Sequence, residues 1–303
     1  MQSLYPNFYM RTILKVVGLS VGSWYDNRVA KGVTQKPGPR PKHTDEQVLC
    51  AVREYLKDPE FYMEGYKKIK VRLAQRGVYV GKERLRLLLS RHGLLCHQSH
   101  RNLPTIDLHD GRILTNRSNQ MWGMDIKEFR VPIGKLYFFD IVDHYNSEVK
   151  GWHLSQGCTR KEAMQALRNA IRSEYGHVEK DVCKDQNLSL RVDHGTQFDS
   201  KDFDCELQFL GIAKSSAFVR SPQSNGVVER FHRTIKEQMV DIYSVKDLSD
   251  AKVKIDRFIK KYNQKWLLHR LGLQSPLDYK NNQIPSGNRE PKGVRHRVKD
   301  SIH

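Results

Sequence analysis

The chain has 303 residues, of which 28% are charged and 38% hydrophobic, as expected for one large or two to three small soluble domains. It has no run of 18 or more apolar residues and no signal-peptide pattern at its start, so we expect neither a membrane span nor secretion. The net charge of +18 favours a polyanionic partner, because lysines and arginines that contact phosphates release counterions.

Five cysteines are present, an odd number, and none forms a C-x-x-C pair. This pattern indicates reduced thiols in a cytoplasmic protein rather than a disulfide framework. The segment Cys96-His97-Gln98-Ser99-His100 matches no standard zinc-ligand spacing, so we expect no metal there.

The first 96 residues predict a helical segment, a linker and a small all-α domain. Residues 11–27, within a segment 1–30, have helix-like apolar spacing, and the proline- and lysine-rich residues 31–43 indicate a basic linker. A capping box at Thr44 to Gln47 begins one helix, and two more follow between Gly65 and Gly93. Their tight connection predicts a helix-turn-helix domain over residues 44–96.

This predicted domain is strongly basic. Between Gly65 and Arg101 there are ten lysines and arginines and one acid, Glu83. The last helix would enter the major groove of DNA. Its candidate DNA contacts are Lys82, Arg84, Arg86 and Arg91. The alternative is an ordinary helical hairpin with a solvated basic face.

The pattern changes after a second linker, residues 97–118. Strand-like runs at residues 121–126, 136–142 and 149–154 precede a helix that begins with a capping box at Thr159. Alternating strands and helices follow, with strands at 188–192 and 212–215 and helices near 200–210, 224–242 and 249–266. The order predicts an α/β catalytic domain with a mixed sheet over residues 119–284, before a basic tail, residues 285–303.

Three acids stand out by their positions. Asp125 lies within the first predicted strand, Asp193 ends a later one, and Glu229 falls on a helix. A carboxylate in an apolar strand is costly to bury without a partner, and a hard divalent cation would supply one. Two such ions about 3.5–4 Å apart stabilise the attacking and leaving oxygens of a phosphodiester.

The spacing and flanks of these acids carry a family resemblance. Asp193 and Glu229 have 35 residues between them, in Asp193-His194-Gly195-Thr196-Gln197-Phe198 and Gly226-Val227-Val228-Glu229. With Asn119 to Ile126, Gly65 to Leu94 and His269 to Leu277, they resemble the DDE transposases of bacterial insertion sequences, OrfB type, whose core is retroviral-integrase-like. The likeness covers roughly residues 11–280.

The resemblance implies an α/β fold, an RNase H-like mixed sheet with flanking helices, preceded by the helix-turn-helix domain. It implies catalysis and metal binding by Asp125, Asp193 and Glu229, with two Mg²⁺ ions as cofactors and Mn²⁺ as the alternative. It also implies cleavage of DNA at insertion-sequence ends and transfer of the 3′-hydroxyl into target DNA. Asp143 matches a family acid that is not a metal ligand, and Asp140 matches no motif.

Further DNA contacts and partners follow from the same resemblance. Arg233 and Lys236 lie four and seven residues after Glu229, on the same helix face, where related integrases grip DNA ends. His232 could face the same way. Partners are expected to be transposon-end and target DNA, a second copy of the chain in at least a homodimer, and an upstream OrfA-type segment or fusion, in the bacterial cytoplasm.

Two other functions remain open from the sequence. One is a non-catalytic DNA-binding regulator that uses residues 44–96, which the acid trio disfavours. The other is a stand-alone RNase H-like nuclease or junction resolvase, which the helix-turn-helix domain disfavours.

Overall fold

The computed structural model describes residues 9–21, 41–96, 115–193, 195–216 and 226–282. The chain divides into two units, Met1–Thr44 and Asp45–His303. Most of both predicted linkers and the whole basic tail lie outside the described residues. In the first unit, helix α1 spans Met10–Val16 and buries Leu14. It is shorter than the predicted segment, because the chain leaves the helix at Gly18, where φ is +70°.

The helices predicted between residues 44 and 93 are present. Helix α3 spans Asp45–Lys57, α4 spans Tyr66–Gln75 and α5 spans Lys82–Arg91. Each buries one apolar stripe, and the stripes meet in a single core that contains Val52, Leu73 and Leu89. Gly77 and Gly93, which follow α4 and α5, have positive φ. They end these helices where the sequence predicts that the helices stop.

The loop between α3 and α4 joins this helical core to the rest of the unit. Phe61 packs edge-on against Trp266, with ring centroids 4.8 Å apart. The Arg72 guanidinium donates to the backbone oxygen of Lys265 at 2.7 Å and pairs with the buried carboxylate of Glu64.

The described part of the sheet has five strands in the order β3-β2-β1-β4-β5. Strands β1 (Met121–Val131), β2 (Gly134–Asp143) and β3 (Val149–Ser155) are antiparallel neighbours. Strands β4 (Ser189–Val192) and β5 (Ala213–Ser216) run parallel to β1 on its other side. The predicted mixed sheet is confirmed.

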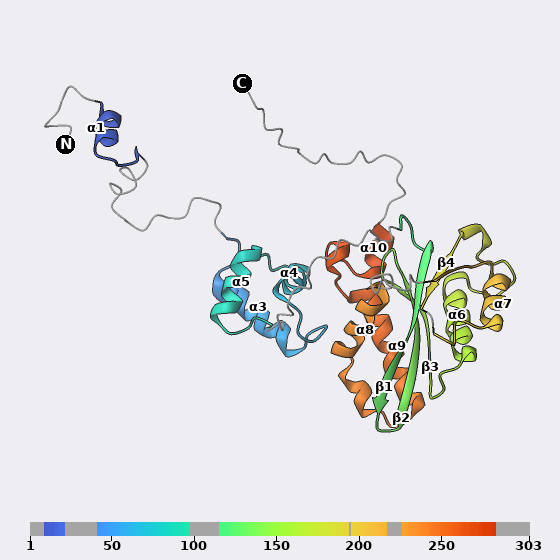
Figure 1. Cartoon of the computed structure of the whole chain (residues 1–303). Helices are drawn as coiled ribbons and strands as arrows, with labels where there is room; N and C mark the ends of the chain where they lie inside the picture. Colours follow the sequence, from blue (N-terminus) through green and yellow to red (C-terminus); the bar gives the residue numbers. More distant parts are fainter. Residues whose placement is uncertain (1–8, 22–40, 97–114, 194, 217–225, 283–303) are drawn as a thin grey trace, which may run out of the picture. The chain divides into compact units, whose positions relative to one another are not determined.

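Helices cover both faces of this sheet, as Figure 1 shows. On one face, α6 (Arg160–Tyr175) and α7 (Lys201–Leu210) pack in a cluster with Trp122 and Phe139. On the other face, α8 (Gly226–Gln238) and α9 (Leu248–Lys265) pack with Phe129 and Phe138. Shorter elements complete the fold: η1 (Lys184–Gln186), η3 (Val240–Ser244), η4 (His269–Leu271) and α10 (Pro276–Asn282). The arrangement is an RNase H-like α/β fold.

Strand β1 is longer than the sequence pattern predicted. Its second half, which is rich in charged residues, pairs with the start of β2 from Lys127 opposite Phe138 to Val131 opposite Gly134. The turn is completed by Gly134, where φ is +112°. Hairpin pairing, rather than apolar content, therefore determines where this strand ends.

Gly151 in β3 provides a test of how closely sheet and helix approach. A Cβ atom at this position would lie 2.4–2.6 Å from the backbone N and Cα and the Cβ of Ala170 in α6. We expect Gly151→Ala to lower the free energy of unfolding by about 1–3 kcal/mol, because backbone must move to admit the methyl group. Urea denaturation measures the change. The control is Gly157→Ala, whose Cβ would make only ordinary contacts from 3.7 Å outward; equal stability of the two variants would contradict the prediction.

All five cysteines are free thiols. Within the described ranges, no helix combines the length and apolarity needed to cross a bilayer.

Candidate active site

Asp125 lies in the middle of β1 and faces the α8–α9 side of the sheet. Side chains alternate along a strand, so Asp125 shares its face with Phe129, which packs in the α8–α9 cluster. The carboxylate is three-quarters buried. Its Oδ1 accepts a hydrogen bond from the backbone N–H of Ile126 at 2.7 Å.

The electrostatics of Asp125 are unusual for a carboxylate. Burial raises its pKa to about 6, and the negative charges of Asp140 and Asp193 act in the same direction. His232 and the backbone N–H of Ile126 oppose this shift. The raised pKa of Asp125 therefore comes mainly from burial, to which the two neighbouring acids add.

Asp193 reaches the same part of the sheet from β4. The parallel pairing ends where Gly123 of β1 lies opposite Arg191 of β4, and Asp193 directly follows the last residue of β4. Asp193 is exposed, and its Oδ1 accepts from the backbone N–H of Gly195 at 3.0 Å. The charge of Asp193 acts on Asp125, so two acids that are distant in sequence lie near each other at the end of β4.

Glu229 lies in the first turn of α8 and is exposed. It precedes His232 by three residues, which places both on one side of the helix about 4.5 Å apart along its axis. His232 contacts Asp125, so Glu229 lies one helical turn from the residue that approaches β1. Even so, no three His, Cys, Asp or Glu side chains among the described residues are grouped so that they could share a metal ion.

Sequence reasoning missed a pair of residues beside Asp125. Asp140 on β2 is fully buried, and its Oδ1 lies 2.5 Å from Nε2 of His232. The other ring nitrogen, Nδ1, lies 3.5 Å from Oδ2 of Asp125. Burial alone would lower the pKa of His232, but the carboxylates of Asp140 and Asp125 outweigh it and raise the pKa. His232 is buried, so it is not presented to DNA. The sequence signal that could have revealed the pair is Asp140, an acid that interrupts the apolar run of β2.

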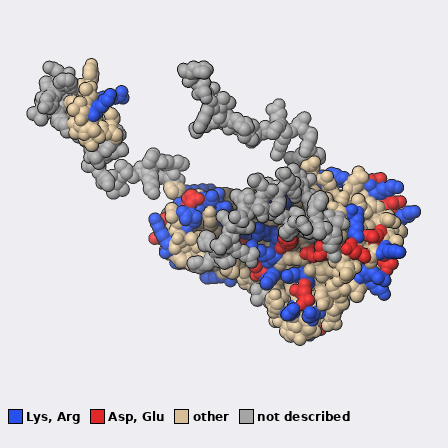
Figure 2. All heavy atoms as spheres, viewed as in Figure 1, with Lys and Arg blue, Asp and Glu red and all other residues tan. Residues whose placement is uncertain are grey.

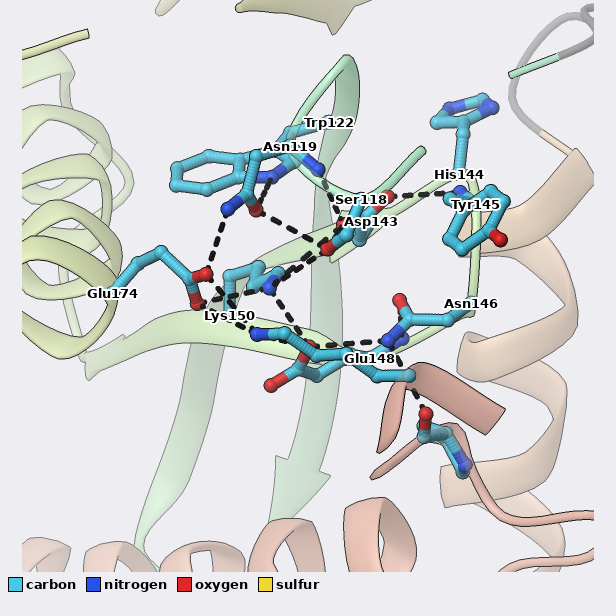
Figure 3. Close-up of polar contacts among 12 residues, drawn as sticks. Ser118, Asn119, Trp122, Asp143, His144, Tyr145, Asn146, Glu148, Lys150 and Glu174 are labelled. Atoms are coloured by element: carbon cyan, nitrogen blue, oxygen red, sulfur yellow. Dashed lines mark hydrogen bonds and ion pairs between the residues drawn. The ribbon is translucent and has the colours of Figure 1, made fainter. Parts of the chain in front are cut away.

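Asp143, at the end of β2, belongs to a different cluster, shown in Figure 3. Its Oδ2 accepts from the Ser118 hydroxyl at 2.6 Å and from the backbone N–H of Asn119 at 2.9 Å. Its Oδ1 accepts from the backbone N–H of Tyr145 at 2.8 Å. These bonds tie the entry of β1 to the turn after β2, which agrees with a structural role.

Lys150 lies at the centre of the same cluster with its side chain only 1% exposed. Its ammonium nitrogen lies 2.8 Å from Glu148, 2.9 Å from Glu174 and 3.8 Å from Asp143. Lys280 of α10 adds a second cation 3.1 Å from Glu174. Burial would raise the pKa of Glu174, but Lys150 and the other partners lower it to about 2. The cluster joins β2, β3, α6 and α10.

The predicted DNA contacts on α5 lie on its exposed side, and three of the four are ion-paired within the chain. Arg84 donates to Asp45 at 2.7 Å, and Arg86 donates to Glu83 at 2.8 Å. Lys82 lies 3.6 Å from Glu83, and Arg91 is exposed in the last turn. Figure 2 shows the same pattern on one face of the molecule, where basic side chains are interspersed with acidic ones.

The basic residues after Glu229 are also exposed. Arg233 pairs with Glu237 at 2.7 Å, and Lys236 lies on the solvent side of α8. Exposed ion pairs of this kind contribute little to stability, so phosphates could replace their acidic partners at small cost.

Comparison with known proteins gives the class of this chain. Residues 115–222 match a family model described as an integrase core domain, and residues 210–276 match a second model with the same description. The two matches together run over more than half of the chain. The chain belongs to the integrase-core family and is, by family, an enzyme of the DDE type.

Within that class, the chain is homologous to bacterial transposases. It is 26% identical over 278 residues to the transposase InsD for insertion element IS2A/D/F/H/I/K of Escherichia coli. The aligned residues cover 89% of this chain and 86% of the relative. It is equally similar to the transposase InsD for insertion element IS2-9 of Escherichia coli strain K12, with 85% of that relative covered.

Solved structures with a likeness to this chain include retroviral proteins. One is the simian T-cell lymphotropic virus intasome in complex with a PP2A regulatory subunit, at 18% identity and a TM-score of 0.48, covering 83% of this chain and 80% of that chain. Another is the HTLV-2 integrase catalytic core domain in complex with magnesium, at 18% identity and a TM-score of 0.43, covering 55% of this chain and 98% of that chain.

Proposed function

We propose that this chain is a transposase that cleaves DNA at the ends of an insertion sequence and transfers the exposed 3′-hydroxyl into target DNA. The observation that supports this most is that the charge of Asp193, just after β4, acts on Asp125 of β1, which in turn contacts His232 of the helix that carries Glu229. We infer from this that the three acids form one site at the end of β4, where a DNA strand would lie.

The three acids are proposed to hold two divalent metal ions, Mg²⁺ or, alternatively, Mn²⁺. The donor set fits, because hard cations take carboxylate oxygens, and a cation would offset the negative charge that Asp140 and Asp193 add beside the buried Asp125. When bound, the ions would supply Lewis-acid stabilisation of the attacking and leaving oxygens.

The residues themselves contribute position and charge. The backbone N–H groups of Ile126 and Gly195 each hold one oxygen of Asp125 and Asp193, which restricts rotation of both carboxylates. Glu229 lies on a different element, α8, so the scissile phosphodiester is proposed to lie between the end of β4 and this helix. The chain needs no covalent nucleophile, because water or a 3′-hydroxyl attacks phosphorus in each step.

DNA is proposed to be held by basic residues of the two regions. The domain formed by residues 44–96 would contact duplex DNA through Lys82, Arg84, Arg86 and Arg91 of α5. Arg233 and Lys236 would hold the DNA end beside Glu229. Two element ends must be joined in one complex, so we propose at least a homodimer, with an upstream OrfA-type segment as a further partner.

A strand-transfer assay with labelled element-end DNA, a supercoiled target and Mg²⁺ tests this proposal. We expect joined products that disappear when EDTA removes the metal. Cleavage without joining would indicate a stand-alone nuclease instead, and binding without either reaction would indicate a DNA-binding regulator.

A further inference from the structure

Two carboxylates lie directly opposite each other on neighbouring strands beside the proposed active site. In the antiparallel register of β1 and β2, Asp125 pairs with Asp140, and both side chains face α8. Side chains opposite each other in such a pair have Cβ atoms about 4.5–5.5 Å apart, and like charges there destabilise the sheet. A group that attracts both carboxylates is needed for this arrangement to be stable.

His232 of α8 is that group. Its Nε2 lies 2.5 Å from Oδ1 of Asp140, and its Nδ1 lies 3.5 Å from Oδ2 of Asp125. The imidazole is 10% exposed and Asp140 is fully buried. Oδ2 of Asp140 makes no hydrogen bond in the part of the chain that the structure describes, so His232 is the group that compensates this carboxylate there.

We propose that His232, held in place by Asp140, is a positioning residue for Asp125. This inference rests on the proposed metal-dependent function. Oδ1 of Asp125 is held by the backbone N–H of Ile126, and Oδ2 faces the imidazole, so each oxygen has its own partner. The carboxylate plane is thereby set before a cation arrives. Asp140 acts one step further away, because it determines where the ring of His232 lies.

The position of His232 on α8 extends this role to Glu229. The two residues are one turn apart on one side of the helix, so the ring that contacts β1 also determines how closely that side of α8 approaches Asp125. The pair thus couples the helix that carries one proposed metal ligand to the strand that carries another. Removal of a group that orients a metal-binding side chain changes metal affinity by about 10- to 100-fold.

The test measures Mn²⁺ binding to the full chain without DNA, from the electron paramagnetic resonance signal of free Mn²⁺. We expect His232→Leu to weaken Mn²⁺ binding by about 10- to 100-fold. His232→Gln, whose side-chain amide supplies an N–H donor in place of the imidazole, should recover part of that loss. In an Asp125→Asn background, His232→Leu should weaken binding by less than about twofold, because the group through which it acts is already altered.

Two further variants separate positioning from folding. Asp140→Leu combined with His232→Leu replaces the buried pair by apolar side chains, which preserves the fold while removing the contact with Asp125. It should fold, as judged by circular dichroism and thermal unfolding, and still bind Mn²⁺ weakly. The matched control is Thr234→Val on the same helix, a buried residue that bonds to the backbone oxygen of Arg230; its Mn²⁺ affinity should equal that of the wild type.

The outcomes distinguish this inference from the proposed function. A wild-type chain that binds no Mn²⁺ would contradict the proposed metal site itself. A folded Asp140→Leu/His232→Leu chain that binds Mn²⁺ within twofold of the wild type would overturn the positioning role alone. A full effect of His232→Leu in the Asp125→Asn background would also overturn it.

Discussion

Replacing Asp193 with asparagine is expected to lower the rate of strand joining by on the order of 1,000-fold while leaving DNA affinity nearly unchanged. The substitution keeps the size of the side chain and the oxygen that accepts from Gly195. It removes the charge that, with Asp125, would hold a cation at the end of β4. A gel assay of joined products and a fluorescence anisotropy titration with element-end DNA measure the two quantities separately.

Asp199→Asn is the matched control for this substitution. Asp199→Asn removes the same charge six residues further along the chain. Asp199 is exposed, and its carboxylate lies 3.5 Å from the ammonium of Lys214. Strand joining by this variant should stay within about twofold of the wild type, as for a weak surface pair. The assignment of Asp193 is wrong if Asp193→Asn still joins strands at the wild-type rate, or if both variants lose activity equally.

Replacing Lys150 with methionine is expected to lower the free energy of unfolding by about 3–5 kcal/mol, because removal of one partner leaves buried charge uncompensated. The ammonium lies within 4 Å of Glu148, Glu174 and Asp143, and the side chain is 1% exposed. Urea denaturation measures the loss. Lys135→Met is the control, since Lys135 is 55% exposed and only 3.5 Å from the surface acid Glu128, a pair worth about 0–1 kcal/mol.

The same cluster predicts a pH dependence of stability. Although burial opposes it, Lys150 holds the pKa of Glu174 at about 2, below the value of an unfolded chain. A carboxyl group with a lowered pKa in the folded state stabilises the fold above its unfolded pKa and loses that contribution as pH falls. Stability should therefore decrease between pH 4.5 and 2 in the wild type, with a smaller slope in Glu174→Gln. An identical slope in both proteins would show that Glu174 does not carry the effect.

Much of the fold follows from local sequence features. The capping box at Thr159 begins α6 as predicted, with Glu162 accepting from the backbone N–H of Thr159. Apolar periodicity located α7 and α9, and the strands 149–154 and 188–192 agree with β3 and β4 within a residue. The far half of β1 was missed, because its charged residues are held by pairing with β2 rather than by burial.

The candidate site was only partly predictable. Asp125 and Asp193 stood out as acids within or beside apolar strands, and the spacing from Asp193 to Glu229, with its flanks, carried the resemblance that implies metal binding; the joint role of the three acids as metal ligands stays a prediction. Asp140 was set aside for want of a motif, and His232 was considered as a DNA contact. Both judgements used the neighbours along the chain, whereas the partner of each residue lies 92 positions away.

By itself, the sequence determined most helices and strands, the glycines that end helices, and the acids that stand out beside apolar segments. These features depend on side chains only a few positions apart. Only the tertiary structure decided that the charge of Asp193 acts on Asp125, that His232 lies between two carboxylates, and that Lys150 is surrounded by three. The physical reason is that the energy of a buried charge depends on the distance to its partner, and that distance exists only after the strands have paired and the helices have packed on them.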